Sequence, residues 1–475
     1  VTSETVTLVV DERPEIIDQP LDRTICEDSD LTFVVNAGAT TEPVYFWEYS
    51  ANGTDWFAAD MLAEVVDHTD DSLNLVAVPS AYHNYQFRAN ISGKCAAPVT
   101  SDAVTLTVYE KPQIDIQPVD EDACEQDTVF FFVDAGVTTN PTYTWQYYNG
   151  SAWVVPSAGI FEGVNDDTLF INGINSSLNG EQYRVVVGGF CSPSVISDTV
   201  ELTVYERPEI LAQPVASEIC ENDSTFFGLN AGVTTNATYK WEYFDGSNWQ
   251  TATGGIFENE NSDTLLLNNV PSSWDGTPFR GIVYGECEPS DTTLEAILNV
   301  RIRPYILTQP SDEVTCENVS VSYSVDAGLT YSPSYQWQYH DGASGWQNTI
   351  GANYSGSNAA TLTINNPVSS MNGYAYRVRL SGYCGPEVIS DSVSLTVEEN
   401  PEITLQPVNA MICENSDTSF TIDAGVTTNP DYTWYYDDGT GWQEVTADGV
   451  HTGFDTNTLE LSNVPFSHDN YSYYA

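Results

Sequence analysis

Hydrophobic and polar residues alternate with a period of two along most of the chain, and turn residues interrupt the alternation about every 8 to 12 positions. In residues 128–136, for example, Phe131, Val133 and Ala135 fall on one face, and residues 142–148 place Tyr143 and Trp145 together. Further alternating segments follow at 167–173, 183–189 and 197–204. No segment shows a 3.6-residue apolar period, so the pattern predicts short β-strands in an all-β sandwich.

This strand pattern repeats five times, and each repeat begins with a proline-centred segment such as "ERPEI". The prolines are 98, 96, 96 and 97 residues apart, the length of one small domain. They are Pro14, Pro112, Pro208, Pro304 and Pro401. The predicted repeats are 12–109, 110–205, 206–301, 302–398 and a truncated repeat at 399–475, with 1–11 as the last strand of a preceding repeat. We therefore expect a tandem array that continues beyond both ends of the sequence.

The joints between the repeats are short. Only a few residues separate the last strand of one predicted repeat from the first strand of the next, and proline restricts the backbone at that step. The joint is thus expected to be a stiff coupling rather than a flexible linker.

Composition narrows the classes of partner. Thirteen basic residues against 68 acidic residues give a net charge of −55, which repels nucleic acid and anionic membranes. Hydrophobic residues make up 41% of the chain and aromatic residues 12%, enough for a core in each repeat. No apolar run approaches the roughly 20 residues that a membrane-spanning helix needs, so no membrane span is expected in these residues.

A tryptophan marks the centre of each repeat. An aliphatic residue stands 12 positions before it, in the pairs Val35–Trp47, Val133–Trp145, Leu229–Trp241, Val325–Trp337 and Ile422–Trp434. About 40 residues after it comes an aromatic residue followed by arginine, at Phe87-Arg88, Tyr183-Arg184, Phe279-Arg280 and Tyr376-Arg377. This pattern resembles the B strand, core C-strand tryptophan and F strand of an immunoglobulin-like domain. The usual cysteine pair between the sheets is missing, and Val35, Val133, Leu229 and Val325 are expected to face Ala89, Val185, Gly281 and Val378 in its place.

A narrower resemblance covers the whole chain. The succession "PEI..QP......CE", "Y.W", "TL.L..V" and "YRV...G.C" is similar to the immunoglobulin-like repeats of large surface and secreted proteins of the Bacteroidota. These include gliding-motility adhesins of the SprB type, which the type IX secretion system exports. The resemblance implies an extracellular protein at a bacterial cell surface.

The nine cysteines occur at two per complete repeat, which is typical of a disulfide framework in an oxidising compartment. A zinc site is not expected, because the cysteines lack paired close spacings and the five histidines follow no repeat position.

Two pairings of these cysteines are open. In an immunoglobulin-like sandwich the first cysteine of a repeat falls at the A–B turn and the second at the F–G hairpin, at opposite ends of strands that span roughly 26 Å. A disulfide requires Cα atoms about 4.4 to 6.8 Å apart, so bonds between neighbouring repeats are preferred to bonds within one repeat, such as Cys124–Cys191. The preferred pairs are Cys26–Cys191, Cys124–Cys287 and Cys220–Cys384, with Cys95, Cys316 and Cys413 left for partners outside the sequence.

No catalytic motif is present, and we expect no enzyme activity: the sequence has no nucleophile motif, glycine-rich phosphate loop or repeating histidine. A second tryptophan in each repeat follows an Asn-Gly or Asp-Gly turn and is best interpreted as part of a hairpin after the C strand. An alternative is a sugar-stacking platform on these rings. The residues are Trp56, Trp153, Trp249, Trp346 and Trp442.

No cofactor is expected. Calcium at the joints is the alternative, with Glu12, Glu110, Glu206 and Glu399 as candidate ligands. Against calcium, a basic residue stands beside the proline in four joints and suits a salt bridge better: Arg13, Lys111, Arg207 and Arg303.

One further motif, Asp followed by Ser or Thr and then an aliphatic residue or Thr, resembles the O-glycosylation signal of Bacteroidota. It is also good turn chemistry before a strand. The candidate sites are Ser72, Thr128, Thr168, Thr199, Ser224, Thr264, Thr292 and Ser392.

Together these features predict the stalk or filament region of a long bacterial cell-surface adhesin, which presents a distal adhesive or motility element. The expected partners are other domains of the same chain, lateral copies of the chain, and glycans or surfaces. The alternatives are glycan-binding or surface-binding modules and a non-catalytic spacer in a multi-modular secreted enzyme.

Overall fold

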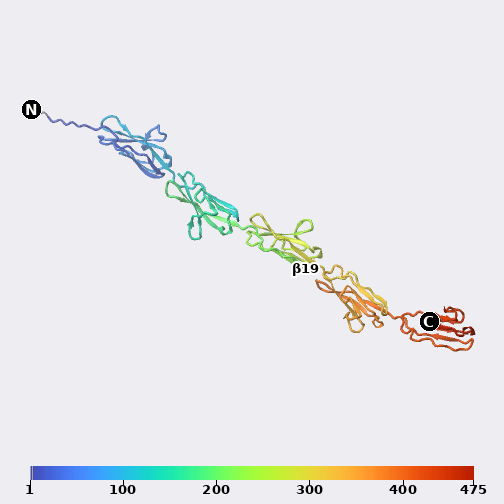
Figure 1. Ribbon diagram of the computed structural model, residues 1–475. Helices are drawn as coiled ribbons and strands as arrows, with labels where there is room; N and C mark the ends of the chain where they lie inside the picture. Colours follow the sequence, from blue (N-terminus) through green and yellow to red (C-terminus); the bar gives the residue numbers. More distant parts are fainter. Residues whose placement is uncertain (1, 3) are drawn as a thin grey trace. The chain divides into compact units, whose positions relative to one another are not determined.

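The computed structural model describes residue 2 and residues 4–475, and strands dominate it throughout (Figure 1). The described chain forms two compact units. The first contains the residues up to Ala212 together with Asn230–Tyr239 and Ile282–Thr292; the second contains Gln213–Leu229, Lys240–Gly281 and Thr293–Ala475. The predicted all-β class is confirmed.

The first predicted repeat contains nine strands and two short 3-10 turns. The strands are β1 (Arg23–Cys26), β2 (Ser29–Val34), β3 (Val44–Ser50), β4 (Phe57–Ala58), β5 (Val65–Asp67), β6 (Ser72–Val78), β7 (Gln86–Ser92), β8 (Val99–Thr100) and β9 (Val104–Tyr109). The turns are η1 (Ala59–Met61) and η2 (Ser80–Tyr82).

The second repeat follows the same order. Its strands are β10 (Glu121–Cys124), β11 (Thr128–Phe132), β12 (Thr142–Tyr148), β13 (Trp153–Val154), β14 (Phe161–Glu162), β15 (Thr168–Asn172), β16 (Glu181–Gly188), β17 (Val195–Ile196) and β18 (Val200–Tyr205), with the turn η3 (Ser176–Leu178).

The third and fourth repeats also have nine strands each. The third has β19 (Ser217–Cys220), β20 (Thr225–Gly228), β21 (Thr238–Phe244), β22 (Trp249–Thr251), β23 (Phe257–Glu258), β24 (Thr264–Leu267), β25 (Thr277–Tyr284), β26 (Asp291–Thr292), β27 (Ala296–Arg301) and η4 (Ser272–Trp274). The fourth has β28 (Glu313–Cys316), β29 (Val321–Ser324), β30 (Ser334–His340), β31 (Gln347–Asn348), β32 (Tyr354–Ser355), β33 (Thr361–Ile364), β34 (Ala375–Ser381), β35 (Val388–Ile389), β36 (Val393–Glu398) and η5 (Ser369–Met371).

The fifth repeat has fewer strands. They are β37 (Thr418–Thr421), β38 (Tyr435–Asp437), β39 (Trp442–Glu444), β40 (His451–Thr452), β41 (Thr458–Leu461) and β42 (Ser472–Tyr474), with the turn η6 (Phe466–His468).

Each complete repeat folds into two sheets. In the second repeat the larger sheet has the order β10-β18-β16-β12-β13, with β17 on β16, and the smaller has the order β11-β15-β14. Strands β10 and β18 are parallel and pair Cys124 with Tyr205, so the first cysteine of the repeat lies beside the end of its last strand. The first, third and fourth repeats have the same two strand orders.

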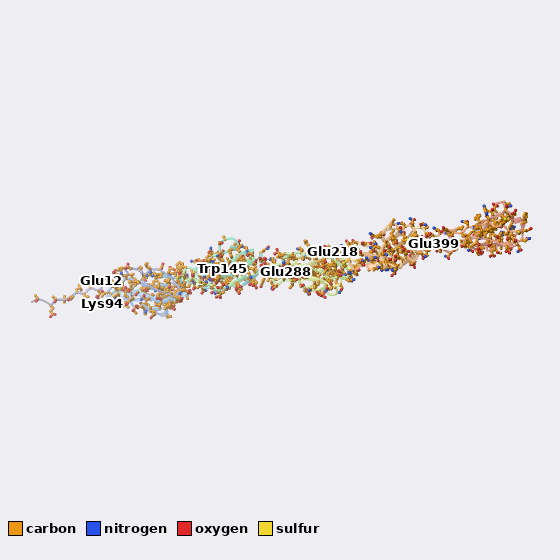
Figure 2. The ribbon with its side chains drawn as sticks, turned by 90° about the horizontal axis from the view of Figure 1, so that it is seen from below. Glu12, Lys94, Trp145, Glu218, Glu288 and Glu399 are labelled. Carbon is orange, nitrogen blue, oxygen red and sulfur yellow. A yellow bond between two sulfur atoms is a disulfide. The ribbon has the colours of Figure 1, made fainter. Side chains whose placement is uncertain are left out.

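The core lies between the two sheets and centres on the repeated tryptophan. Trp145, labelled in Figure 2, is fully buried, and its indole Nε1 donates a hydrogen bond to Asp166 O at 3.0 Å. Because this one polar atom has a partner, the large ring is buried without an unsatisfied donor. The same bond recurs from Trp47 to Asp70, Trp241 to Ser262, Trp337 to Ala359 and Trp434 to Thr456.

Small and aliphatic residues occupy the place of the missing cysteine pair between the two sheets. Gly281 faces Leu229, and a Cβ atom added to Gly281 would lie 2.4 Å from Leu229 Cδ2. In the second repeat the smaller Val133 leaves space for Val185, and both are fully buried. Aliphatic packing therefore occupies the place that a disulfide takes in antibody domains.

The predicted strand at residues 1–11 is not paired into a sheet among the described residues, where the first strand is β1. A strand needs a neighbour for its ladder hydrogen bonds, and the described residues before Asp11 have none. Residues 1 and 3 lie outside the described part.

No helix among the described residues is long and apolar enough to cross a membrane.

Candidate functional site

Three disulfides join neighbouring repeats. They are Cys26–Cys191, Cys124–Cys287 and Cys220–Cys384, with Cα atoms 5.7, 5.8 and 5.8 Å apart. In each, a cysteine at the end of a repeat's first strand meets a cysteine in the last hairpin of the following repeat. The structure does not join Cys124 to Cys191, the alternative within one repeat.

The strand order explains this pairing. Because β10 runs parallel to β18, Cys124 lies at the edge where the chain leaves the second repeat. Cys287 Sγ lies 3.6 Å from Tyr205 O, at the end of β18, and is buried there. Cys191 and Cys384 make the same approach to Tyr109 O and Arg301 O, at 3.5 Å each.

The other three cysteines form no disulfide in the described chain. Cys95 is half-buried, and Cys316 and Cys413 are exposed.

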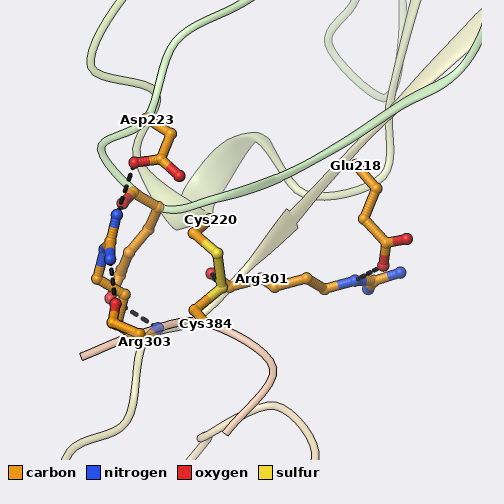
Figure 3. Close-up of a disulfide and its surroundings, with 8 residues drawn as sticks. Glu218, Cys220, Asp223, Arg301, Arg303 and Cys384 are labelled. Atoms are coloured by element: carbon orange, nitrogen blue, oxygen red, sulfur yellow. Dashed lines mark hydrogen bonds and ion pairs between the residues drawn. A yellow bond between two sulfur atoms is a disulfide. The ribbon is translucent and has the colours of Figure 1, made fainter. Parts of the chain in front are cut away.

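A basic side chain stands beside the disulfide in each of these joints. We call Lys111, Arg207 and Arg303 the joint cations. Figure 3 shows Arg303: its Nε donates to Glu221 O at 3.0 Å, and its Nη2 lies 2.6 Å from Asp223 Oδ1. These two partners belong to the turn that follows Cys220.

The same guanidinium also reaches the next repeat. Arg303 Nη1 donates to the carbonyl oxygen of Gly385, the residue after Cys384. One side chain therefore contacts both sides of the joint that the Cys220–Cys384 disulfide crosses. The planar fork of arginine suits such a task, since it donates in several directions at once.

Arg207 repeats this arrangement one joint earlier. Its Nε donates to Glu125 O at 2.7 Å, its Nη2 lies 2.6 Å from Asp127 Oδ1, and its Nη1 donates to Glu288 O, next to Cys287. Both arginines are about one-third exposed, so water and salt screen these ion pairs in part.

The joint before the second repeat and the joint before the fifth have fewer of these contacts. Lys111 donates through its backbone N–H to Glu27 and through Nζ to Asp28 Oδ2 at 2.9 Å. At the fourth joint Asn400 replaces the cation and donates to Glu317 O at 3.3 Å.

Hydrogen bonds also hold the joint to the repeat that follows it. Glu110 N donates to Thr139 Oγ1 at 2.9 Å, and Gln113 N donates to Thr138 Oγ1 at 3.0 Å. Between them Pro112 is buried and lies 3.5 Å from the place where a Cβ atom of Gly189 would stand. Two hydrogen bonds and the packing of Pro112 therefore hold the joint segment against the following repeat.

The four glutamates considered as calcium ligands all lie at this position. Each donates its backbone N–H to a threonine of the following repeat: Glu12 to Thr41, Glu110 to Thr139, Glu206 to Thr235 and Glu399 to Thr428. Within the described residues, no group of three or more His, Cys, Asp or Glu side chains is arranged to hold a metal ion. Calcium at the joints stays a prediction.

At two joints, the last residue of a repeat's final strand contacts an aromatic ring of the next repeat. Tyr109, the last residue of β9, packs against Phe190 with ring centroids 4.2 Å apart. In the third joint Arg301 replaces the tyrosine and places its guanidinium 4.2 Å from the ring of Tyr331. A hydrogen bond from Arg301 to Glu218 is the largest cause that raises the pKa of this arginine.

Four of the five hairpin tryptophans have one ring face covered. The guanidinium of the F-strand arginine lies about 4 Å from each ring, in the pairs Arg88–Trp56, Arg184–Trp153, Arg280–Trp249 and Arg377–Trp346. Trp442 instead packs edge-on against Tyr474 and is half exposed. These contacts hold the hairpin against the sheet, while sugar binding on these rings stays a prediction.

The candidate O-glycosylation sites are all accessible in part. Exposed hydroxyl residues are Thr128, Thr199, Ser224, Thr292 and Ser392, and half-buried ones are Ser72, Thr168 and Thr264. Three of the hydroxyls hydrogen-bond neighbouring polar side chains, as Thr168 does with Asp167. Their modification remains a prediction.

Sequence reasoning missed the partners of the joint cations. It expected salt bridges there but did not identify Asp127 and Asp223, which stand three residues after Cys124 and Cys220. The signal is present as "CEQD" and "CEND" in two successive repeats.

Comparisons with known proteins give partial sequence matches and a set of similar solved structures. No protein-family profile matches the chain. Human Roundabout homolog 2 is 24% identical over 142 residues, which cover 30% of this chain and 10% of that protein. Human Roundabout homolog 1 is 24% identical over 247 residues, 49% of this chain and 14% of that protein. The chain thus spans a small part of the curated relatives that it matches.

Two solved structures illustrate the likeness. The I-band fragment I67–I69 from titin has a TM-score of 0.44 and 15% identity, and covers 61% of this chain and 99% of its own. The Sidekick-1 immunoglobulin domains 1–5 have a TM-score of 0.32 and 13% identity, with 98% and 96% covered. With the repeated two-sheet strand order and the buried tryptophan of each repeat, the chain is an all-β protein of tandem immunoglobulin-like domains.

Proposed function

We propose that this chain is the stalk region of an extracellular adhesin at a bacterial cell surface, where it acts as a stiff spacer that presents a distal element. The observation that carries the proposal is that two of the joints are each crossed by both a disulfide and an arginine side chain. A disulfide and a joint cation bridge the same two turns, as Cys124–Cys287 and Arg207 do.

Each fastening limits a different motion. The disulfide fixes the distance between two turns, and the arginine, which donates to both turns, resists rotation about that bond. Because the joint proline is also buried against the next repeat, bending at the joint requires several of these contacts to break together. Nearest-neighbour contacts of this kind also contribute to the stability of each domain in an array.

The chemistry of the chain suits an extracellular location. Disulfides form and persist in oxidising compartments outside the cytosol. The net charge of −55 keeps such a chain soluble and disfavours contacts between copies. The bacterial surface itself is supported by the likeness of the repeats to surface proteins of the Bacteroidota.

The experiment measures bending at one joint. We expect electron micrographs of the purified chain to give a narrow distribution of angles between the second and third repeats. Replacing Cys124 and Cys287 by Ser should widen the distribution, and adding Arg207→Ala should widen it further. Angles that stay equally narrow in the triple variant would contradict the joint fastening as the source of stiffness.

Location is tested separately. Antibodies against the repeats should label intact cells of the source organism as strongly as lysed cells; labelling after lysis alone would overturn the surface assignment.

A further inference from the structure

The smaller sheet of the second repeat carries an exposed aromatic cluster on its outer face. Phe130 and Phe132 on β11 and Phe170 on β15 are 52%, 39% and 40% exposed. Phe130 and Phe170 are direct cross-strand partners, and their ring centroids are 6.0 Å apart. We call these three residues the phenylalanine patch.

Neither fold nor core packing requires these rings. The fourth repeat has the same sheet, and its residues at the three positions are Ser322, Ser324 and Thr363, with Ser322 paired to Thr363 as Phe130 is to Phe170. Polar residues thus suffice at these positions. Three large apolar side chains gathered on one exposed face are a candidate interaction surface.

The rim of the patch is acidic. Glu162 pairs with Phe170 on the neighbouring strand β14, and Asp134 follows Phe132 on the same outward side of the chain. No ion pair to either carboxylate occurs in the described part of the chain. The third repeat keeps a reduced version of the same surface, with Phe226, Leu266 and Glu258.

Both basic residues of the second repeat have partners elsewhere and do not pair with these two carboxylates. Residues 110–205 contain fourteen acidic residues but two basic ones, Lys111 and Arg184. Lys111 is bound to Asp28 at the joint, and Arg184 lies over Trp153 in the larger sheet. A second copy would bring the same negative charge to the patch, which disfavours it as the occupant.

We propose that the phenylalanine patch binds a cationic polypeptide whose docking face combines apolar and Lys or Arg side chains. The apolar side chains cover the three rings, and the cations reach Glu162 and Asp134 or lie over exposed ring faces. This site is independent of the stalk role, since the three rings lie on the smaller sheet and take no part in the joint contacts described above.

The test uses the whole chain and a defined probe. The probe is a fluorescent amphipathic leucine–lysine peptide, and its matched control has serine in place of each leucine. The variant Phe130→Ser/Phe132→Ser/Phe170→Thr copies the fourth repeat and should fold, which circular dichroism verifies.

We expect the triple variant to bind the leucine–lysine peptide about tenfold more weakly than the original chain, and to bind the serine–lysine peptide unchanged. In the reverse design, Ser322→Phe/Ser324→Phe/Thr363→Phe should add a second binding site. Equal affinity of the original chain for both peptides, or of the triple variant for the leucine–lysine peptide, would overturn the proposal. So would concentration-dependent self-association in sedimentation that the triple variant abolishes, because the occupant would then be a second copy.

Discussion

Single residues decide how the core replaces the antibody-type cysteine pair. Gly281 faces the larger Leu229 in the third repeat, whereas Val185 faces the smaller Val133 in the second. Close packing of protein interiors explains why a larger residue on one side needs a smaller one on the other. The neighbouring tryptophan does not vary. In every repeat it is buried and its indole N–H donates a hydrogen bond to a backbone carbonyl.

This size relation predicts a compensated double substitution. Gly281→Ala alone should destabilise the third repeat by about 1 to 3 kcal/mol, because its Cβ atom would overlap Leu229 Cδ2. Adding Leu229→Val should recover most of that loss. Hydrogen exchange of β24 amides measures the effect, and Gly228→Ala, whose Cβ atom would meet no atom nearer than 3.7 Å, is the matched control. If the double variant is less stable than Gly281→Ala, the facing relation is wrong.

A second residue-scale prediction concerns acid. Burial disfavours the charged form of Asp448, but hydrogen bonds from the backbone N–H groups of His451 and Val450 and from the His451 ring outweigh it and lower the pKa to about 2. A depressed folded-state pKa stabilises the repeat above the ordinary value of 3.8, and this contribution is lost as the pH falls toward 2. Amide exchange in residues 448–451, corrected for the intrinsic exchange rate at each pH, should therefore accelerate as the pH falls between those values.

The control for this prediction is Asp448→Asn, which removes the titrating group. We expect the variant to show little of the acceleration between pH 3.8 and 2. An acceleration of the same size in both proteins would assign the acid response to other carboxylates.

At the scale of elements, the parallel pairing of the short strand β10 with β18 places Cys124 at the joint. Period-two patterning and the spacing of tryptophan, aromatic and cysteine residues allowed the sandwich to be predicted, because burial of alternate side chains is a local property of the sequence. The resemblance to immunoglobulin-like domains then placed Cys124 and Cys191 at opposite ends. The hydrogen bonds of Arg207 could not be predicted, since they depend on where two turns from two different repeats meet.

The joint cations give an element-scale prediction. Arg207→Ala removes donors to Glu125 O and Glu288 O and the ion pair with Asp127. Because the groups are partly exposed, we expect a loss of roughly 1 kcal/mol, seen as about fivefold faster amide exchange in the turn after Cys124 and the hairpin at Cys287. The matched control is Arg13→Ala, at the equivalent position before the first repeat. Unchanged exchange in Arg207→Ala would show that the disulfide alone holds the turns.

At the scale of the whole molecule, the disulfides link the repeats in an overlapping series. The second repeat uses Cys191 toward the first and Cys124 toward the third. Each bond spans more than 160 residues of chain. Closing a loop of that size lowers the conformational entropy of the unfolded state, which stabilises the folded state by about 5 kcal/mol. On the proposed stalk role, we expect the joints to limit both unfolding and bending.

Peptide mapping under non-reducing conditions tests the central claim most directly. The purified chain is digested without reduction, and mass spectrometry identifies the linked peptides. We predict peptides that join Cys26 to Cys191, Cys124 to Cys287 and Cys220 to Cys384. A peptide that joins Cys124 to Cys191 would place the bond inside one repeat and contradict the account.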